Sequence, residues 1–246
     1  PMTPEAYHIK QDIGIVMQNV AVYNELTVYE NIDYFCGLYI QDKNLRKELV
    51  LEAIDFVSLG EYAKFYPNKL SGGLLRRLNI ACGIAHRPKL IILDEPTVAV
   101  DPQSRNKILE GILELNRQGA TIIYTSHYME EVERICSRIM ILDKGKAIAT
   151  GTNNELKSMI TTGEKITVES NDVSAEQLAK IRQLPNIVSV EYNKPLLVIK
   201  SSRGSNNLEM FLDFIKKEGI QFSKIYSELP TLNDVFLELT GRALRD

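Results

Sequence analysis

Two apolar segments that each end in polar residues constrain the fold of this chain most strongly. The first, LIILDEP, starts at Leu90, and the second, ATIIYTSH, starts at Ala120. Between them, Asp101 is suited to cap a helix that begins at Pro102 and runs to about Gln118. Fully apolar strands joined through a helix are typical of parallel sheets with right-handed crossovers. The sequence therefore predicts an α/β fold.

Potentially catalytic side chains stand where these strands end. Ligands of parallel sheets bind beyond the carboxyl ends of the strands, so Asp94, Glu95 and His127 are expected at one edge. A third apolar run, IGIVMQ, ends at Gln18, which could reach the same edge. Phosphoryl transfer needs a metal ion, a positioned water and a proton acceptor. An acidic pair alone is more often a solvated strand end, but its combination with His127 favours this chemistry.

The segment LSGG presents a second candidate site. Ser71 is suited to cap a helix, and Gly72 and Gly73 would let an anion approach the exposed amides at its positive end. A plain capped helix with a flexible entry explains the same residues equally well. The segment alone therefore leaves both interpretations open.

The remaining pattern predicts helices before these strands and a different fold after them. Thr27 and Glu30 form a capping box, and apolar spacing predicts a helix over 45–57 with Gly60 as its C′ residue. From Glu164 the order is β-α-β-β-α-β, which is typical of a ferredoxin-like fold, and a helix over 232–239 follows. The segment 161–163 is the expected linker.

Composition excludes some classes of protein. The net charge of −3 and the isoelectric point of 5.8 argue against a dedicated nucleic-acid binder. The three cysteines are far apart, which predicts buried thiols rather than a metal site. No apolar run approaches the ~18 residues that indicate a membrane span. Any link to a membrane is therefore expected through a partner protein.

Together, the motifs make the chain resemble the ATP-binding subunit of ABC transporters. LSGGLLRR resembles the signature motif, LIILDEP the Walker B strand, TVAVDP the D-loop, TSH the switch histidine and IGIVMQ the Q-loop. The resemblance covers Ile13 to about Gly151. TVAVDPQSR and PTLNDVFLELTGR resemble more narrowly the ABC-2 type exporters, including multidrug and antibiotic exporters. The resemblance to the ABC transporters implies an α/β P-loop NTPase-type core with an incomplete parallel sheet and a helical subdomain. It also implies a C-terminal α+β ferredoxin-like domain.

The resemblance also implies residue roles. Asp94 would hold Mg²⁺ through water, Glu95 would be the general base, and His127 would contact the γ-phosphate. Gln18 would touch Mg²⁺ or the attacking water and would report to the membrane subunit. The ATP held by a second copy would bind the residues Ser71, Gly72 and Gly73, and Asp101 would lie across the dimer interface.

The implied protein is an ATPase that powers an ABC-2 type exporter. Its implied partners are the membrane permease and a second ATPase subunit, with a homodimer expected and no nucleic acid. The resemblance implies that the protein is bound peripherally to the cytoplasmic face of the plasma membrane of a bacterium. The expected domains are an ATPase domain over 1–160, with a helical subdomain over about 19–87, and an accessory domain over 164–242.

The sequence departs from the family pattern in places. Leu74 stands where many members have Gln, and Ala99 where the D-loop often has Gly. The phosphate loop G-x-x-x-x-G-K-[ST] is not matched, since the Gly145–Lys146 pair is followed by Ala147. The chain is therefore expected to begin after that loop, to be inactive alone, and to expose apolar core surface.

Two other readings remain. A non-transport ATPase of the superfamily would carry coiled coils or tandem cassettes, which this sequence does not show. A catalytically incompetent fragment or interaction module would have no need of Glu95 and His127. Their presence favours descent from an active enzyme.

Overall fold

The computed structural model of the protein describes residues 6–202 and 207–241. The chain forms two compact units, one over 1–131 and one over 132–246, which are described separately. The second unit thus begins at Val132, five residues after His127. The division into domains over 1–160 and 164–242 stays a prediction.

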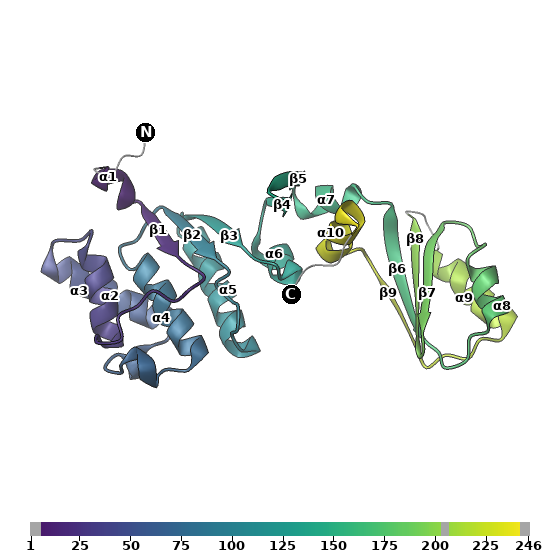
Figure 1. The fold of residues 1–246 in the computed structure, drawn as a ribbon, viewed down its shortest axis with the longest axis horizontal. Coiled ribbons are helices and arrows are strands. Elements are labelled where there is room, and N and C mark those ends of the chain that lie inside the picture. Colours follow the sequence, from purple (N-terminus) through teal and green to yellow (C-terminus); the bar gives the residue numbers. More distant parts are fainter. Residues whose placement is uncertain (1–5, 203–206, 242–246) are drawn as a thin grey trace. The chain divides into compact units, whose positions relative to one another are not determined.

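The first unit is built on a three-stranded parallel sheet with the order β1-β2-β3. Its elements are α1 (Tyr7–Lys10), β1 (Ile13–Val16), α2 (Val28–Gly37), α3 (Lys43–Phe56), the 3₁₀ turns η1 (Gly60–Tyr62) and η2 (Pro67–Lys69), α4 (Gly72–Ile84), β2 (Leu90–Asp94), α5 (Pro102–Arg117), β3 (Thr121–Thr125) and α6 (Met129–Ile135), which crosses into the second unit. Figure 1 shows β2 between the other two strands. The predicted parallel sheet is therefore confirmed.

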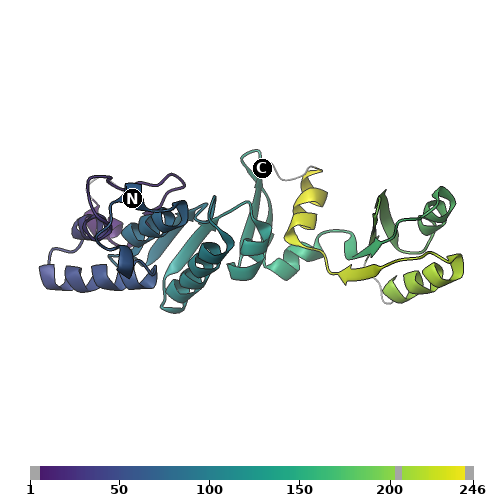
Figure 2. The same cartoon turned by 90° about the horizontal axis from the view of Figure 1, so that it is seen from below.

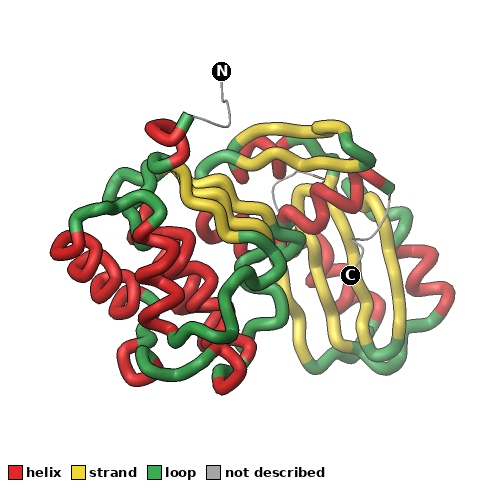
Figure 3. Tube along the Cα trace, turned by 60° about the vertical axis from the view of Figure 1, so that its left-hand side comes forward, coloured by secondary structure: helices red, strands yellow, loops and turns green. Residues whose placement is uncertain are grey.

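The two faces of this sheet differ in exposure. Val16, Ile91 and Leu93 are at most 1% exposed on the face that α4 and α5 cover. Ile15 and Ile123 point to the other face and are 54% and 49% exposed. In Figure 2, α5 lies beside the strands, and Figure 3 shows the strands next to one another. The expected exposure of apolar sheet surface is confirmed.

The predicted helix starts are confirmed, but one predicted helix end is wrong. Thr27 and Glu30 form the capping box of α2. Helix α3 ends at a left-handed Ser58, φ +54°, and Gly60 instead opens η1. The amides of Ser58 and Leu59 donate to carbonyls of the last turn, as in a Schellman motif. Apolar spacing favoured the nearest glycine, but Ser58 takes the left-handed position.

Strand β1 and helix α4 meet through two glycines. A Cβ on Gly14 would collide with the carbonyl oxygen of Gly83 and lie 2.7 Å from Pro88 Cγ. A Cβ on Gly83 would lie 2.7 Å from Val16 Cγ2 and 3.0 Å from the carbonyl oxygen of Ile15. Backbone atoms cannot retreat as a flexible side chain can, so this contact requires both glycines.

We expect Gly14→Ala to lower the free energy of unfolding by about 1–3 kcal/mol, the usual cost of overpacking, because the colliding atom is a backbone oxygen that cannot move aside. The matched control is Gly60→Ala, because no atom lies within 4 Å of a Cβ built there. Urea unfolding followed by circular dichroism measures both. Equal stability of the two variants would refute the close approach of β1 and α4.

The second unit contains a four-stranded antiparallel sheet with the order β7-β8-β6-β9. Its elements are β4 (Ile139–Asp143), β5 (Lys146–Gly151), α7 (Asn153–Ser158), β6 (Thr162–Glu169), α8 (Ala175–Ile181), β7 (Ile187–Asn193), β8 (Leu196–Ser202), α9 (Asn207–Glu218), β9 (Lys224–Glu228) and α10 (Leu232–Thr240). Figure 1 shows α8 and α9 on one side of this sheet. The β-α-β-β-α-β order and the strand pairing confirm the ferredoxin-like arrangement.

The core of this unit lies between its sheet and α9, where Phe211, Ile166 and Ile199 are at most 1% exposed. The expected linker over 161–163 is wrong. Thr162 and Gly163 belong to β6, and Thr161 N donates to Glu238 Oε1 at 2.6 Å. The change of sequence pattern near Glu164 suggested a linker, but Thr161 and Thr162 are hydrogen-bonded to Glu238 of α10.

Two expectations from composition can be compared with the structure. Cys36 and Cys82 are buried, Cys136 is half-buried, and all three are free thiols. Burial raises the pKa of Cys36 to about 11. Along residues 6–202 and 207–241, no helix has the length and apolar character needed to cross a membrane.

Candidate functional site

The edge of the first sheet brings three of the predicted residues together. Asp94 ends β2, Glu95 follows it, and His127 lies two residues beyond β3. His127 Nδ1 is 3.0 Å from Glu95 Oε1, which makes the two side chains a hydrogen-bonded pair. The parallel register opposes Asp94 to Thr125, so the strand ends coincide. The predicted convergence at this edge is present.

The backbone of Glu95 is unusual. Its φ of +47° lies in the left-handed region, which a residue with a long side chain adopts at a cost of about 1–2 kcal/mol. Its amide donates to the carbonyl oxygen and to the hydroxyl of Thr125, both at 3.2 Å. Such strain persists only where the surroundings hold it, and it is concentrated at functional sites.

Thr125 also orients the carboxylate of Asp94. Its hydroxyl donates to Asp94 Oδ1 at 2.6 Å. The carboxylate of Glu95 can accept a further hydrogen bond, because its Oε2 is buried and accepts none within the described residues. An acceptor oriented in this way and a buried oxygen beside it suit a site that receives a cation or a water.

The donor set fits Mg²⁺ rather than a metal caged by protein ligands. Within the described residues, no cluster of three or more His, Cys, Asp or Glu side chains is arranged to hold a metal ion. Mg²⁺ keeps several waters and uses one or two carboxylates together with substrate phosphates. Asp94 and Glu95 meet that requirement.

The fourth predicted residue, Gln18, joins this edge through its backbone. It lies two residues after β1, is exposed, and its carbonyl oxygen accepts from Arg76 Nη1 at 2.6 Å. Arg76 on α4 is only 4% exposed. Burial lowers the pKa of its guanidinium, while the charges of Asp94 and Glu95 oppose that shift.

The residues predicted to bind a phosphate of a second copy, Ser71, Gly72 and Gly73, lie at the start of α4 and next to Asp101 of the same chain. Ser71 caps α4 and accepts from the amide of Leu74 at 3.3 Å. A Cβ on Gly73 would lie 3.1 Å from both Asp101 Oδ2 and Ser104 Oγ. Gly72 is exposed, and Asp101 caps α5 and accepts from Ser104 N at 2.9 Å.

A buried carboxylate holds the loops around the site. Glu131 on α6 is 4% exposed, and its Oε2 accepts from Thr97 Oγ1 at 2.7 Å and Tyr124 OH at 2.5 Å. Ser126 Oγ donates at 3.4 Å, and Arg105 Nε lies 3.3 Å from Oε1. Burial and the bond to Glu131 raise the pKa of Tyr124, which keeps its hydroxyl a donor.

Sequence reasoning missed Arg76, Thr125 and Glu131. Arg76 could have been found, because it stands on the buried helical stripe that carries Gly73, Asn79 and Ile80, at i−3, i+3 and i+4 from it. A charged residue on such a stripe must find partners inside the fold. Thr125 and Glu131 gave no comparable signal, since exposed threonines and helix glutamates are common.

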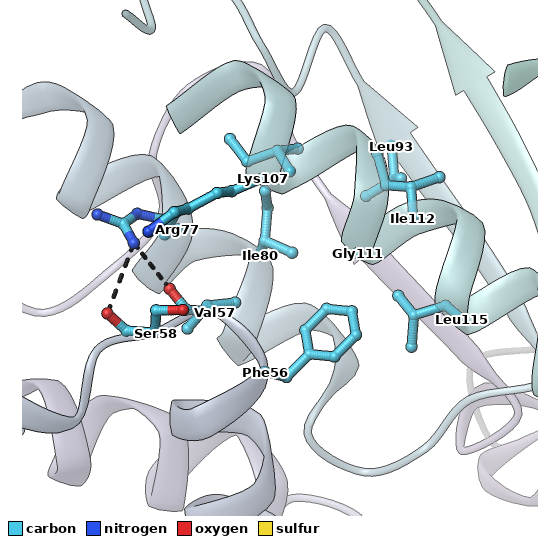
Figure 4. Close-up of a pocket in the computed structure, with 11 residues that line it drawn as sticks. Phe56, Val57, Ser58, Arg77, Ile80, Leu93, Lys107, Gly111, Ile112 and Leu115 are labelled. Carbon is cyan, nitrogen blue, oxygen red and sulfur yellow. Dashed lines mark hydrogen bonds between the residues drawn. The ribbon is translucent and has the colours of Figure 1, made fainter. Parts of the chain in front are cut away.

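A cavity lies between α3, α4 and α5, lined by Phe56, Arg77, Ile80, Lys107 and Gly111 among others (Figure 4). Arg77 reaches across it to the carbonyl oxygens of Val57 at 3.0 Å and Ser58 at 3.5 Å. Its volume of about 20 Å³ is that of a single water. It is therefore a packing gap of the helical layer and not a nucleotide site.

Comparison with known proteins assigns both parts of the chain. Residues 2–98 match the family profile "ABC transporter", and residues 151–240 match "ATP-binding protein DrrA1-3-like, C-terminal domain". The chain is 39% identical to the linearmycin resistance ATP-binding protein LnrL of Bacillus subtilis (strain 168), over 98% of the chain and 78% of that protein. It is 31% identical to the daunorubicin resistance ATP-binding protein DrrA3 of Streptomyces coeruleorubidus, over 96% and 75%.

Solved structures of ATP-binding cassettes are also similar to this chain. The ATP-binding cassette MJ0796, in a dimeric post-hydrolysis state bound to ADP and Pi, is 28% identical and superposes with a TM-score of 0.57. The match covers 62% of this chain and 68% of that one. The motifs, the parallel sheet and these similarities lead to one conclusion: the chain belongs to the ABC transporter ATP-binding subunits, a family of transport ATPases.

Proposed function

We propose that this protein hydrolyses ATP at the edge formed by β2 and β3 and thereby powers an ABC-2 type exporter. The observation that carries the proposal is the Glu95–His127 hydrogen bond of 3.0 Å beside Asp94. Glu95 takes the proton of the attacking water, because its Oε2 is buried and free to accept it. His127 holds Glu95 in place and orients the γ-phosphate.

Asp94 and Gln18 form the metal side of the proposed site. The hydroxyl of Thr125 fixes Asp94 so that its carboxylate can hold Mg²⁺ through water. When bound, Mg²⁺ supplies neutralisation of charge on the β- and γ-phosphate oxygens. Gln18 stands in the loop after β1, from which its side chain would touch the metal or the attacking water and report to the membrane subunit.

Ser71, Gly72 and Gly73 complete the site of a second copy in this proposal, with Asp101 at the dimer interface. This part of the proposal is supported by the position of the three residues at the amino end of α4, where exposed amides and the helix dipole favour binding of a phosphate. The dimeric state named for MJ0796 agrees with a paired arrangement.

Export is favoured over import by the relatives. They include the Nod factor export ATP-binding protein I of Rhizobium meliloti (strain 1021), 33% identical over all of this chain and 71% of that protein. By comparison, an import protein, the methionine import ATP-binding protein MetN of Carboxydothermus hydrogenoformans, has the lower identity of 29%. We therefore propose a peripheral subunit on the cytoplasmic face of a bacterial membrane, bound to an ABC-2 type permease.

The test is metal-dependent hydrolysis by the full-length protein isolated with its membrane partner. We expect chelation with EDTA to abolish ATP hydrolysis and added Mg²⁺ to restore it. Asp94→Asn should raise the Mg²⁺ concentration for half-maximal rate by about tenfold or more, since one carboxylate charge is lost. The control is Asp172→Asn at an exposed site of the second unit. Hydrolysis that persists without divalent metal would refute the proposal.

A further inference from the structure

The guanidinium of Arg76 makes an unusual set of bonds. All five of its N–H groups can be assigned to main-chain carbonyl oxygens, and none of these bonds goes to a carboxylate. The acceptors are Pro96 O at 2.9 Å from Nε, Met17 O at 3.0 Å and Gln18 O at 2.6 Å from Nη1, and Asp94 O at 3.2 Å and Glu95 O from Nη2.

These acceptors come from two loops that carry the proposed chemistry. Two carbonyls belong to the loop after β1, which holds Gln18. The other three belong to the consecutive residues Asp94, Glu95 and Pro96, at the end of β2 and in the turn that follows it. Three consecutive carbonyls can converge on one group only where the chain turns sharply. The left-handed backbone of Glu95, φ +47°, makes that turn.

We propose that Arg76 is a positioning residue for ATP hydrolysis: it holds the strained backbone of Glu95 and the loop of Gln18 in one frame. The inference rests on the proposed hydrolysis at Glu95. Because a strained residue persists only where its surroundings hold it, the bonds from Arg76 keep the Glu95 carboxylate aimed at His127.

Helix α4, which carries Arg76, holds the loop of Gln18 through a second side chain as well. Arg76 lies five residues after Ser71 on α4, about one and a half turns along the helix. Asn79, about one turn further, holds the same loop by donating to Met17 O at 3.2 Å and accepting from Ala21 N at 3.0 Å. Arg76 and Asn79 thus tie α4 to the loops of Glu95 and Gln18.

Lysine cannot replace this arginine. A lysine has three donors on a compact ammonium, whereas the guanidinium presents five in a fixed planar fork. The neighbouring Arg77 is the natural control, because its guanidinium bonds Val57 O and Ser58 O at the end of α3 (Figure 4).

The experiment compares wild type, Arg76→Lys and Arg77→Lys in the full-length protein with its membrane partner. We expect Arg76→Lys to lower kcat about 100-fold, the usual effect of a misplaced catalytic group, with KM for Mg-ATP nearly unchanged. Arg77→Lys should retain the wild-type kcat. An Arg76→Lys enzyme as fast as wild type, or an equal loss in both variants, would overturn the inference. An inactive wild type would instead refute the proposed function.

Chemical rescue separates positioning from a purely structural role. Arg76→Ala leaves a space shaped for a guanidinium, so millimolar guanidinium should restore part of kcat, whereas methylammonium should not. Circular dichroism and urea midpoints report whether each variant is folded. Variants that unfold and are not restored by guanidinium would show that Arg76 serves folding alone, which contradicts the proposal.

Discussion

Glu95→Gln is expected to lower kcat for ATP hydrolysis by about 10²–10⁴-fold, because an amide cannot accept the proton of the attacking water. The substitution keeps the side-chain volume and can keep a hydrogen bond to His127 Nδ1. Binding of ATP should be retained, since the proposed phosphate contacts come from other residues. ATP-bound dimers should therefore accumulate.

The measurement is steady-state hydrolysis by the full-length protein with its membrane partner, together with nucleotide binding. Glu25→Gln, at an exposed position before α2, is the matched control and should keep the wild-type rate. A Glu95→Gln enzyme with wild-type kcat would show that another group accepts the proton. Loss of binding as well as rate would assign Glu95 to nucleotide affinity instead.

Glu131→Ala is expected to lower the free energy of unfolding by about 3–5 kcal/mol, the usual cost of removing one partner from a buried charged network. The change leaves the hydroxyls of Thr97, Tyr124 and Ser126 without their acceptor, and it leaves Arg105 without its ion pair. Buried polar groups without partners cost more than the bonds contribute when formed.

Urea unfolding of the wild type, Glu131→Ala and Glu130→Ala tests this network. Glu130 precedes Glu131 on α6 but is exposed, so its removal should change stability by less than about 0.5 kcal/mol. Similar small changes in both variants would mean that the bonds of Glu131 do not stabilise the loops of Thr97 and Ser126.

The sequence predicted the elements whose signals are local. Thr27 with Glu30, and Asp101 before Pro102, satisfy amide groups within their own helix turn, so their identities mark the helix starts directly. The apolar runs that end at Asp94 and His127 predicted the sheet edge for the same reason. Parallel pairing then brings the strand ends together without further information.

The features that the sequence did not reveal depend on distant contacts. The left-handed Glu95 follows from its bonds to Thr125 and Arg76, which lie 30 and 19 residues away. Ser58 ends α3 although Gly60 is the better left-handed residue, because the carbonyls of that turn and Arg77 fix the chain there. Local propensity cannot report such constraints.

The central claim is that Asp94, Glu95 and His127 form the hydrolytic half of a nucleotide site. A crystal structure of the full-length Glu95→Gln variant with ATP and Mg²⁺ tests it most directly. The account predicts the metal beside Asp94, the γ-phosphate within hydrogen-bond distance of His127, and Ser71 of a second copy on the same phosphate. A nucleotide bound away from His127, with Asp94 free of metal, would contradict it.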